Sequence, residues 1–307
     1  MSNTVNSYNG ILCMDKPAGF TSFDVIGKLR GILQMKKLGH TGTLDPMATG
    51  VLPVLVGSAT KACDLLPNGD KTYAVQVQFG METDTLDTTG TVTASYPSMH
   101  VTRAALTQTI STFLGESFQV PPMYSAVSVG GKRLYQYARE GKAVERPARP
   151  IIVYTWTIED WDATAQVAHM TISCGKGTYV RALVRDLGRA LGGGATMTSL
   201  CRTAASGFTL SQCYTFAQVE QFVAEGTLSS KLLPIDTIFT MYPALLLSPK
   251  QTTLYKNGVR LALERLQLPE GLDQTHTTVR VYGADDTFLG LATAATAQGE
   301  LRILKNF

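Results

Sequence analysis

Asp45 is the first residue whose surroundings suggest chemistry. It lies in LGHTGTLDPMATGVLPV, residues 38–54, where one acid stands among glycines, threonines and apolar side chains and directly precedes Pro46. The residue before a proline is pushed into an extended conformation, so the carboxylate is presented from a stiff turn. An ordinary aspartate is ionised near neutral pH and can act as a nucleophile or an electrostatic stabiliser. An Asp-Pro pair in a plain turn is the commoner alternative, and this stretch alone does not exclude it.

Other familiar chemistries are absent from the sequence. GGKR at 130–133 lacks the upstream glycine of a phosphate-binding loop, and GKG at 175–177 lacks the third glycine of a dinucleotide fingerprint. The acidic segment GMETDTLDTTG at 80–90 does not match a calcium loop, and we expect it to be an ordered loop. The five cysteines and four histidines show no metal-ligand spacing. These patterns favour a reduced protein without a metal.

The chain shows no targeting or membrane signal. Its first residues, MSNTVNSYNG, are polar and lack an apolar signal core, and no run of 18 uncharged apolar residues occurs. We therefore expect a cytoplasmic protein with no membrane partner.

Clustered cations indicate a polyanionic partner. Residues 28–37 contain four cations and no acid, and residues 132–149 contain six cations against two acids, with Tyr135 and Tyr137 among them. Cations interleaved with aromatics suit a nucleic acid. A solvated helix face is the alternative that charge alone leaves open.

The elements that must position Asp45 can be predicted on both sides of it. ILCMD at 11–15 predicts a strand, and after a Pro-Ala-Gly turn Thr21 or Ser22 can cap a helix with apolar residues at helical spacing as far as Leu33. KTYAVQVQF at 71–79 alternates, which places Tyr73 on one strand face with Val75, Val77 and Phe79. From this pattern alone Tyr73 is a core residue.

Residues 167–194 predict a strand, a glycine turn and a helix that stops at GGG. The helix carries an apolar stripe, and Arg181, Arg185 and Arg189 recur every four residues along another face. On spacing alone, these arginines would be exposed.

The sequence pattern changes near residue 247, and this change indicates a second domain. A helical segment at 215–226 and a connector at 232–249 come before short strand-forming runs separated by turns. We expect domains at 1–240 and 247–307.

Five segments between residue 11 and about residue 208 resemble the bacterial TruB-type tRNA pseudouridine synthases, in the family's order. They are DKPAGFTS, KKLGHTGTLDPMATGVLPVLVGSATK, KTYAVQVQFGMETDTLDTTG, VPPMYSAVSVGGKRLYQYAREGKAVER and CGKGTYVRALVRDLGRALGGGATMTSLCRTAASGF. The resemblance implies an enzyme that isomerises uridine to pseudouridine at position 55 in the T loop of tRNA. It implies base flipping, no cofactor and no metal.

The resemblance also implies three catalytic roles. Asp45 matches the catalytic aspartate. Tyr73 matches the tyrosine that packs on the target base and moves a proton. Arg181 matches the arginine that pairs with the aspartate. Attack at C6, attack at C1′ and formation of a glycal by loss of the C2′ proton all stay open.

Four further matches imply substrate binding. Tyr179 and Leu200 match pocket residues, His40 matches a histidine that contacts the RNA near the flipped base, and Lys61 matches a basic residue of the cleft. Ser128 departs from the family, which often has a lysine there, so one phosphate contact is expected to be missing.

The implied fold is α+β, with a long mixed sheet flanked by helices and a small C-terminal β-rich PUA-like domain. An insertion at about 95–150 is expected to grip the T stem-loop, and the PUA-like domain to add RNA contacts. We expect a monomer that acts without a protein partner or guide RNA. The alternative is an RNA-binding or tRNA-folding protein in which isomerisation is secondary.

Overall fold

The computed structural model describes residues 8–66, 69–270, 272, 277–295 and 298–307. The expectation about the N-terminus concerns residues 1–7 for the most part, which lie outside the described residues. Among the described helices, none is long and apolar enough to cross a membrane.

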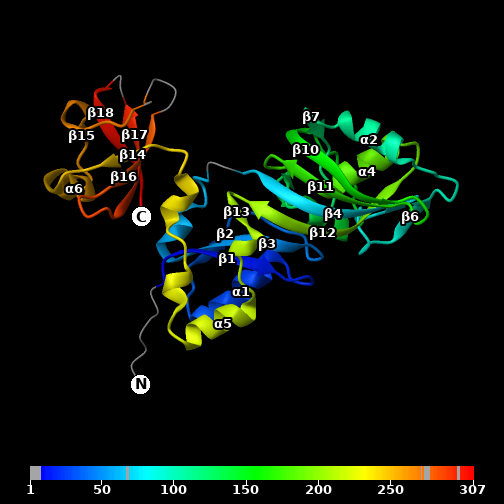
Figure 1. Cartoon of the computed structure of the whole chain (residues 1–307), viewed down its shortest axis with the longest axis horizontal. Helices are drawn as coiled ribbons and strands as arrows, with labels where there is room; N and C mark the ends of the chain where they lie inside the picture. Colours follow the sequence, from blue (N-terminus) through cyan, green and yellow to red (C-terminus); the bar gives the residue numbers. More distant parts are fainter. Residues whose placement is uncertain (1–7, 67–68, 271, 273–276, 296–297) are drawn as a thin grey trace.

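A large mixed sheet forms the centre of the molecule (Figure 1). Its strands in the described chain are β1 (Gly10–Lys16), β2 (Leu38–His40), β3 (Thr49–Val56), β4 (Lys71–Phe79), β7 (Gly115–Gln119), β10 (Arg149–Asp162), β11 (Val167–Cys174), β12 (Ala195–Ala205) and β13 (Phe208–Thr209). The order is β1-β3-β12-β4-β11-β10-β7, with β2 beside β3 and β13 beside β12. β3 and β12 pair in parallel, whereas the other pairs are antiparallel.

Helices cover this sheet in two groups. They are α1 (Ser22–Leu33) with α5 (Phe216–Ala224), and α2 (Arg103–Ser111) with α4 (Val180–Ala190). α3 (Leu134–Arg139) belongs to neither group, and the 3-10 turns are η1 (Gly57–Ala62), η2 (Leu210–Gln212), η3 (Leu228–Lys231) and η4 (Ile235–Phe239). In Figure 1, α1 and α5 lie below β1 and β3, and α2 and α4 lie beside β10 and β11 at the right of the view. Each group closes a separate hydrophobic cluster against the sheet.

The elements predicted around the site are confirmed. Thr21 caps α1 and forms a capping box with Asp24, and the apolar stripe that ends at Leu33 is buried. β4 follows the predicted alternation and buries Tyr73 on the same face as Val75. The helix expected after the glycine turn is α4, and the one expected at 215–226 is α5.

The segment at 80–90 was expected to be a loop, and this is wrong in part. β5 (Met81–Thr83) pairs with β6 (Val92–Ser95). The ribbon is stabilised by tertiary contacts that local sequence does not reveal, because Glu82 is buried and pairs with Arg189 of α4.

Residues 95–150, expected as an RNA-gripping insertion, have two parts. α2 packs near α4, and β7 is the edge strand of the main sheet. The rest forms a small ribbon of β8 (Ser128–Val129) and β9 (Lys132–Arg133), followed by α3. We call residues 123–142 the ribbon segment.

The C-terminal part forms a sheet of its own. Its strands are β14 (Ala244–Leu246), β15 (Leu261–Ala262), β16 (Thr278–Tyr282), β17 (Phe288–Ala295) and β18 (Glu300–Asn306), in the order β14-β16-β17-β18-β15, with α6 (Pro249–Lys256) and the 3-10 turn η5 (Leu263–Arg265). β14 precedes residue 247, so the sheet begins within the expected connector. α6 was not predicted, although Ser248 caps it and Pro249 is its first residue.

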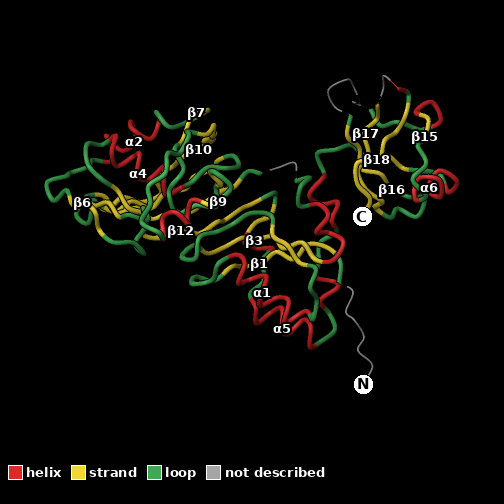
Figure 2. The backbone as a smooth tube through the Cα atoms, turned by 180° about the vertical axis from the view of Figure 1, so that it is seen from behind, coloured by secondary structure: helices red, strands yellow, loops and turns green. Residues whose placement is uncertain are grey.

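The connector joins the two sheets through an aromatic cluster. Phe239 lies within stacking distance of Tyr242, Phe288 and Phe307. Figure 2 shows the C-terminal sheet at the end of the molecule opposite β6.

Candidate active site

The loop that carries Asp45 is anchored on both sides of that residue. Ser22 is buried at the start of α1, and its hydroxyl accepts a hydrogen bond from the Leu44 N–H at 2.8 Å. On the other side, the Pro46 carbonyl accepts from the Gly19 N–H at 2.8 Å. The position of Asp45 is therefore set by the DKPAGFTS segment, more than twenty residues upstream.

Lys16 is the centre of that anchor. Its side chain is fully buried, and its ammonium donates to the carbonyls of Pro17 at 2.9 Å, Phe20 at 2.6 Å and Pro46 at 3.3 Å. Burial lowers the pKa of Lys16 to about 8, and the charge of Asp45 opposes that shift. The ammonium thus connects the turn after β1 to the peptide that follows Asp45.

Asp45 and Arg181 form a two-pronged ion pair. Arg181 Nε lies 2.8 Å from Asp45 Oδ2, and Nη2 donates to Oδ1 at 3.0 Å. The arginine side chain is only 5% exposed and the aspartate side chain 33% exposed. A planar guanidinium that contacts both oxygens fixes the plane of the carboxylate as well as its charge. Asp45 is therefore held in one orientation with part of its surface open.

Arg181 is itself fixed by three further groups. Nη1 donates to the Thr85 carbonyl at 2.8 Å, and Nη2 donates to the Tyr124 carbonyl at 2.8 Å. The carboxylate of Asp87, which is almost fully buried, lies 3.8 Å from Nε. The arginine thus connects Asp45 with the turn between β5 and β6 and with the ribbon segment.

The start of α4 is clamped by Gln119 of β7. The Gln119 side chain accepts from the Tyr179 N–H at 2.9 Å and donates to the Tyr179 carbonyl at 3.1 Å. Tyr179 is the N-cap residue of α4 and has no side-chain cap. Burial raises the pKa of the Tyr179 phenol, so it stays protonated at neutral pH.

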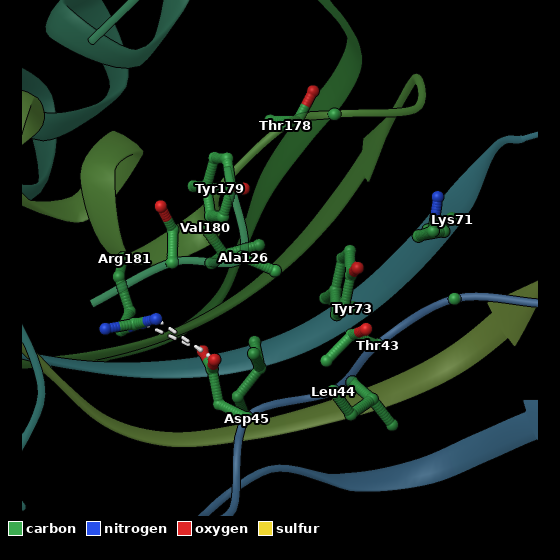
Figure 3. A pocket seen from close by; sticks show the side chains of 14 residues that line it. Thr43, Leu44, Asp45, Lys71, Tyr73, Ala126, Thr178, Tyr179, Val180 and Arg181 are labelled. Atoms are coloured by element: carbon green, nitrogen blue, oxygen red, sulfur yellow. Dashed lines mark hydrogen bonds and ion pairs between the residues drawn. The ribbon is translucent and has the colours of Figure 1, made fainter. Parts of the chain in front are cut away.

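A pocket of about 250 Å³ lies beside the ion pair. Its wall includes Asp45, Arg181, Tyr73, Tyr179 and Leu200. In Figure 3, Tyr73 lies between the Asp45–Arg181 pair on one side and Lys71 on the other. The structure therefore brings together five of the seven residues singled out from the sequence.

Tyr73 is a neutral phenol on the pocket wall. It is 6% exposed, and burial raises its pKa to about 12, whereas the charge of Arg202 acts in the opposite direction. Its aromatic ring offers a stacking surface, and its hydroxyl is a proton carrier beside the carboxylate.

Two predicted residues do not line this pocket. His40 ends β2; its pKa is lowered, first by burial and then by the charge of Arg202, and its Nδ1 atom is buried without a hydrogen-bond partner among the described residues. Lys61 lies in η1 and donates to the Asn306 carbonyl of the C-terminal sheet at 3.0 Å. Lys61 thus joins the two sheets.

Two cations of the ribbon segment lie over aromatic rings of the same segment. Lys132 lies over the Tyr137 ring at 4.8 Å, and Arg139 lies over the Tyr135 ring at 5.5 Å. Tyr135 and Arg139 also line a groove of about 540 Å³ that reaches Asp45 from the side of α1 and includes Phe23, whose side chain is exposed.

Sequence reasoning missed four groups: Lys16, Lys71, Asp87 and Arg202. Three of them had a visible signal, which is a charged residue in or at the end of a strand. Lys16 ends GILCMDK, and Arg202 stands in ATMTSLCRTAA. Lys71 begins the alternating strand KTYAVQVQF. Asp87 gave a weaker signal among threonines. Arg181 and Arg185 are also buried, so the arginine face of α4 is not the solvent face that spacing suggested. In the part of the chain that the structure describes, no group of three His, Cys, Asp or Glu side chains could hold a metal ion.

Comparisons with known protein families match two parts of the chain. Residues 30–180 match the N-terminal domain of the TruB family pseudouridylate synthases, and residues 181–240 match the C-terminal domain of tRNA pseudouridylate synthase B.

Curated relatives are similar over most of their length. The tRNA pseudouridine synthase B of Dehalococcoides mccartyi (strain CBDB1) is 41% identical over 288 residues, which cover 94% of this chain and 93% of the relative. That of Bacillus subtilis (strain 168) is 41% identical over 262 residues, with 82% and 83% covered.

Solved structures show the same fold at low identity. A Cbf5-Nop10-Gar1 complex contains a chain that is 23% identical, with a TM-score of 0.75 and 98% and 85% of the two chains covered. An archaeal box H/ACA sRNP Nop10-Cbf5 complex contains one that is 21% identical, with a TM-score of 0.72 and 100% and 88% covered. The expected α+β architecture, with its long mixed sheet and small C-terminal β domain, is thereby confirmed.

Proposed function

Because this chain belongs to the TruB family of tRNA pseudouridine synthases, which are isomerases, we propose that it converts the uridine at position 55 in the T loop of tRNA into pseudouridine. The observation that carries the proposal is the carboxylate of Asp45, held by both oxygens at the mouth of a pocket walled by Tyr73. The proposal goes beyond family membership in the position of the target, the roles of the residues and the sequence of events.

The target base must leave the RNA stack to reach Asp45. The carboxylate lies on the pocket wall with its neighbours buried, so a base within a helix could not approach it. An enzyme that acts on such a base flips it into a pocket and replaces the lost stacking with its own side chains. Tyr73 provides the aromatic face, and Leu200 and Tyr179 border the same space.

Asp45 then promotes cleavage of the N1–C1′ bond. Its carboxylate needs no separate base in order to act as a nucleophile, and Arg181 holds it in one orientation. The freed uracil rotates in the pocket and rejoins the ribose through C5. The proton on C5 then leaves, and Tyr73 is the proton-moving group on the pocket wall. Atoms are conserved overall, so the reaction needs no redox partner.

The remaining parts of the chain are proposed to bind the tRNA. The catalytic domain, 1–240, includes the 95–150 region, whose ribbon segment presents Arg139 and Tyr135 at the groove that leads to Asp45. His40 and Lys61 are assigned to the RNA path outside the pocket. The PUA-like domain, 247–307, adds contacts through its cations, which are Lys256, Arg260, Arg280, Arg302 and Lys305.

The test is a reaction of the purified chain with an unmodified T-arm hairpin, without cofactor, guide RNA or second protein, followed by mapping of pseudouridine. Product is expected at the uridine that corresponds to position 55 and at no other uridine of the loop. The matched control RNA carries cytidine at that position. An unmodified hairpin after complete binding would contradict the proposal and would favour an RNA-binding role.

A further inference from the structure

Arg202 is a cation that is completely shielded from solvent beneath the pocket. Its side chain is 0% exposed and is the largest among those that are fully buried. None of the ion pairs among the described residues includes it. Burying a charge without an opposite charge is costly, so its hydrogen bonds must offset that cost. A residue kept under those conditions calls for an explanation beyond packing.

The guanidinium binds the loop that leads to Asp45. Nε donates to the Val51 carbonyl of β3 at 2.8 Å, Nη1 donates to the Thr43 carbonyl at 3.3 Å, and Nη2 donates to the Gly42 carbonyl at 3.2 Å. Two of these carbonyls belong to residues two and three positions before Asp45. The loop is therefore attached from below to the central strand β12.

Arg202 also lies directly opposite Tyr73 in the sheet. Arg202 and Tyr73 are direct partners across β12 and β4, and the register shifts immediately after Arg202. Such an irregularity re-aims side chains, and residues directly opposite each other point to the same sheet face. The charge of Arg202 lowers the pKa of Tyr73, and the tyrosine raises that of Arg202, in each case against the effect of burial.

Close packing leaves little freedom at this position. Gly50 has φ +99°, and a Cβ added there would lie 2.3 Å from the Arg202 carbonyl oxygen. The backbone of β12 thus approaches β3 as closely as only glycine allows. This approach sets where the guanidinium emerges between Tyr73 and the loop.

We propose that Arg202 is a positioning residue of the isomerisation, which fixes the Tyr73 hydroxyl relative to Asp45 and sets a buried positive charge against the tyrosine oxygen. The inference rests on the proposed roles of Asp45 and Tyr73. To take up the proton from C5, the Tyr73 hydroxyl must give up its own proton, so negative charge develops on its oxygen, and a preorganised cation that no acid neutralises stabilises that charge. Arg181 cannot serve this purpose, because Asp45 occupies its fork.

A measurement without RNA tests the contact first. All tyrosines are replaced by a fluorinated tyrosine, whose more acidic phenol brings titration into a range where the protein stays folded. The fluorine resonance of residue 73 is assigned by its loss in Tyr73→Phe. Besides Arg202, the groups that act on this phenol are Cys174 of β11 and Asp45, and both are kept unchanged. In Arg202→Met, residue 73 should titrate about one pH unit higher than in the wild type. An unchanged titration would overturn the proposal.

Tyr255 provides an internal comparison if the Arg202 variants do not fold. Its phenol is also buried, and its hydroxyl has no partner among the described residues. Burial raises its pKa without an opposing cation. In the wild-type protein, residue 73 should therefore titrate at lower pH than residue 255, which is assigned by Tyr255→Phe. The opposite order would refute the inference.

Kinetics with the T-arm hairpin test the consequence. At saturating RNA, single-turnover rates should fall in the order wild type, Arg202→Lys, Arg202→Met, with a loss of about ten- to hundredfold for lysine and hairpin affinity within about threefold. Arg185→Lys is the matched control, because Arg185 is also buried and donates to a carbonyl but lines none of the described pockets. The single-turnover rate of this variant should stay within about twofold of the wild-type rate. A wild-type rate in Arg202→Lys would overturn the role. If the wild type makes no pseudouridine, the proposed function fails, whereas the fluorine titration still decides whether Arg202 controls Tyr73.

Discussion

Charge is arranged in opposite ways in the pocket and in the C-terminal sheet. Around the pocket, Lys16, Arg181 and Arg202 are all buried, and each is held by backbone carbonyls. Beside the C-terminal sheet, just before β15 and in η5, the side chains of Arg260 and Arg265 are 65% and 81% exposed. Buried charges that are held by backbone carbonyls keep one geometry, which a bond-breaking step requires. Exposed charges on mobile side chains can follow a phosphate backbone, but salt weakens them.

The sharpest test of this contrast is Asp45→Asn. The amide keeps the shape of the side chain but removes the nucleophile, so the single-turnover rate should fall by about a thousandfold or more. Binding of the T-arm hairpin should stay within about threefold, because phosphate contacts dominate affinity. Quantitative mapping of pseudouridine with a filter-binding titration measures both. Turnover near the wild-type rate would move the chemistry away from Asp45.

The next largest effect is expected for Arg181→Lys. A lysine keeps the charge but cannot contact both oxygens of Asp45 together with the carbonyls of Thr85 and Tyr124. We expect the rate at saturating RNA to fall about a hundredfold, with folding retained as judged by circular dichroism. Full activity in this variant would mean that the fork does not orient the carboxylate.

Lys16→Met should affect stability first and rate second. Methionine fills a similar volume but leaves the carbonyls of Pro17 and Phe20 without the ammonium donor, whereas the Pro46 carbonyl keeps the Gly19 N–H. An unsatisfied buried acceptor costs about 1–3 kcal/mol, so the free energy of unfolding should fall by about that amount. The denaturant midpoint should fall with it. The exposed Lys250 provides the control, and Lys250→Met should leave the midpoint unchanged. Equal midpoints for the two variants would show that the buried ammonium is not an anchor.

The smallest effect on chemistry is expected in the C-terminal sheet. Truncation near Pro249 would remove the partners of β14 and uncover Phe239, so substitution of exposed charges is the cleaner experiment. Lys256→Gln combined with Arg302→Gln should weaken hairpin binding about tenfold and reduce the salt slope by about two. The single-turnover rate at saturating RNA should stay within about twofold. A large loss of rate at saturation would place this sheet in the reaction itself.

Local patterns predicted the elements around the site well, because each depends on neighbours in sequence. The capped helix α1 and the alternating strand β4 follow from spacing and capping alone. Asp45 stood out through its proline and glycines, but the resemblance was needed to prefer chemistry to a turn. Tyr73 and Arg181 likewise looked like a core residue and a surface residue until the family motif was considered.

The missed features depend on contacts between distant segments. Arg202 is separated by more than 150 residues from the carbonyls that it binds, so no local pattern connects them. The ribbon of β5 and β6 is stabilised by α4, and Lys61 bonds to a strand about 245 residues away. Only tertiary structure shows whether such charges are buried, because the same residue types are usually exposed.

The clamp of Gln119 on Tyr179 has a consequence for proton balance. A side-chain amide has no ionisable group, so both of its bonds to the Tyr179 backbone keep their strength across the physiological pH range. A glutamate of the same shape would accept from the N–H but would face the carbonyl with a second acceptor. The hydrogen bonds between the edge strand β7 and α4 therefore do not depend on pH, and the alignment of the two elements does not change when protons move in the neighbouring pocket.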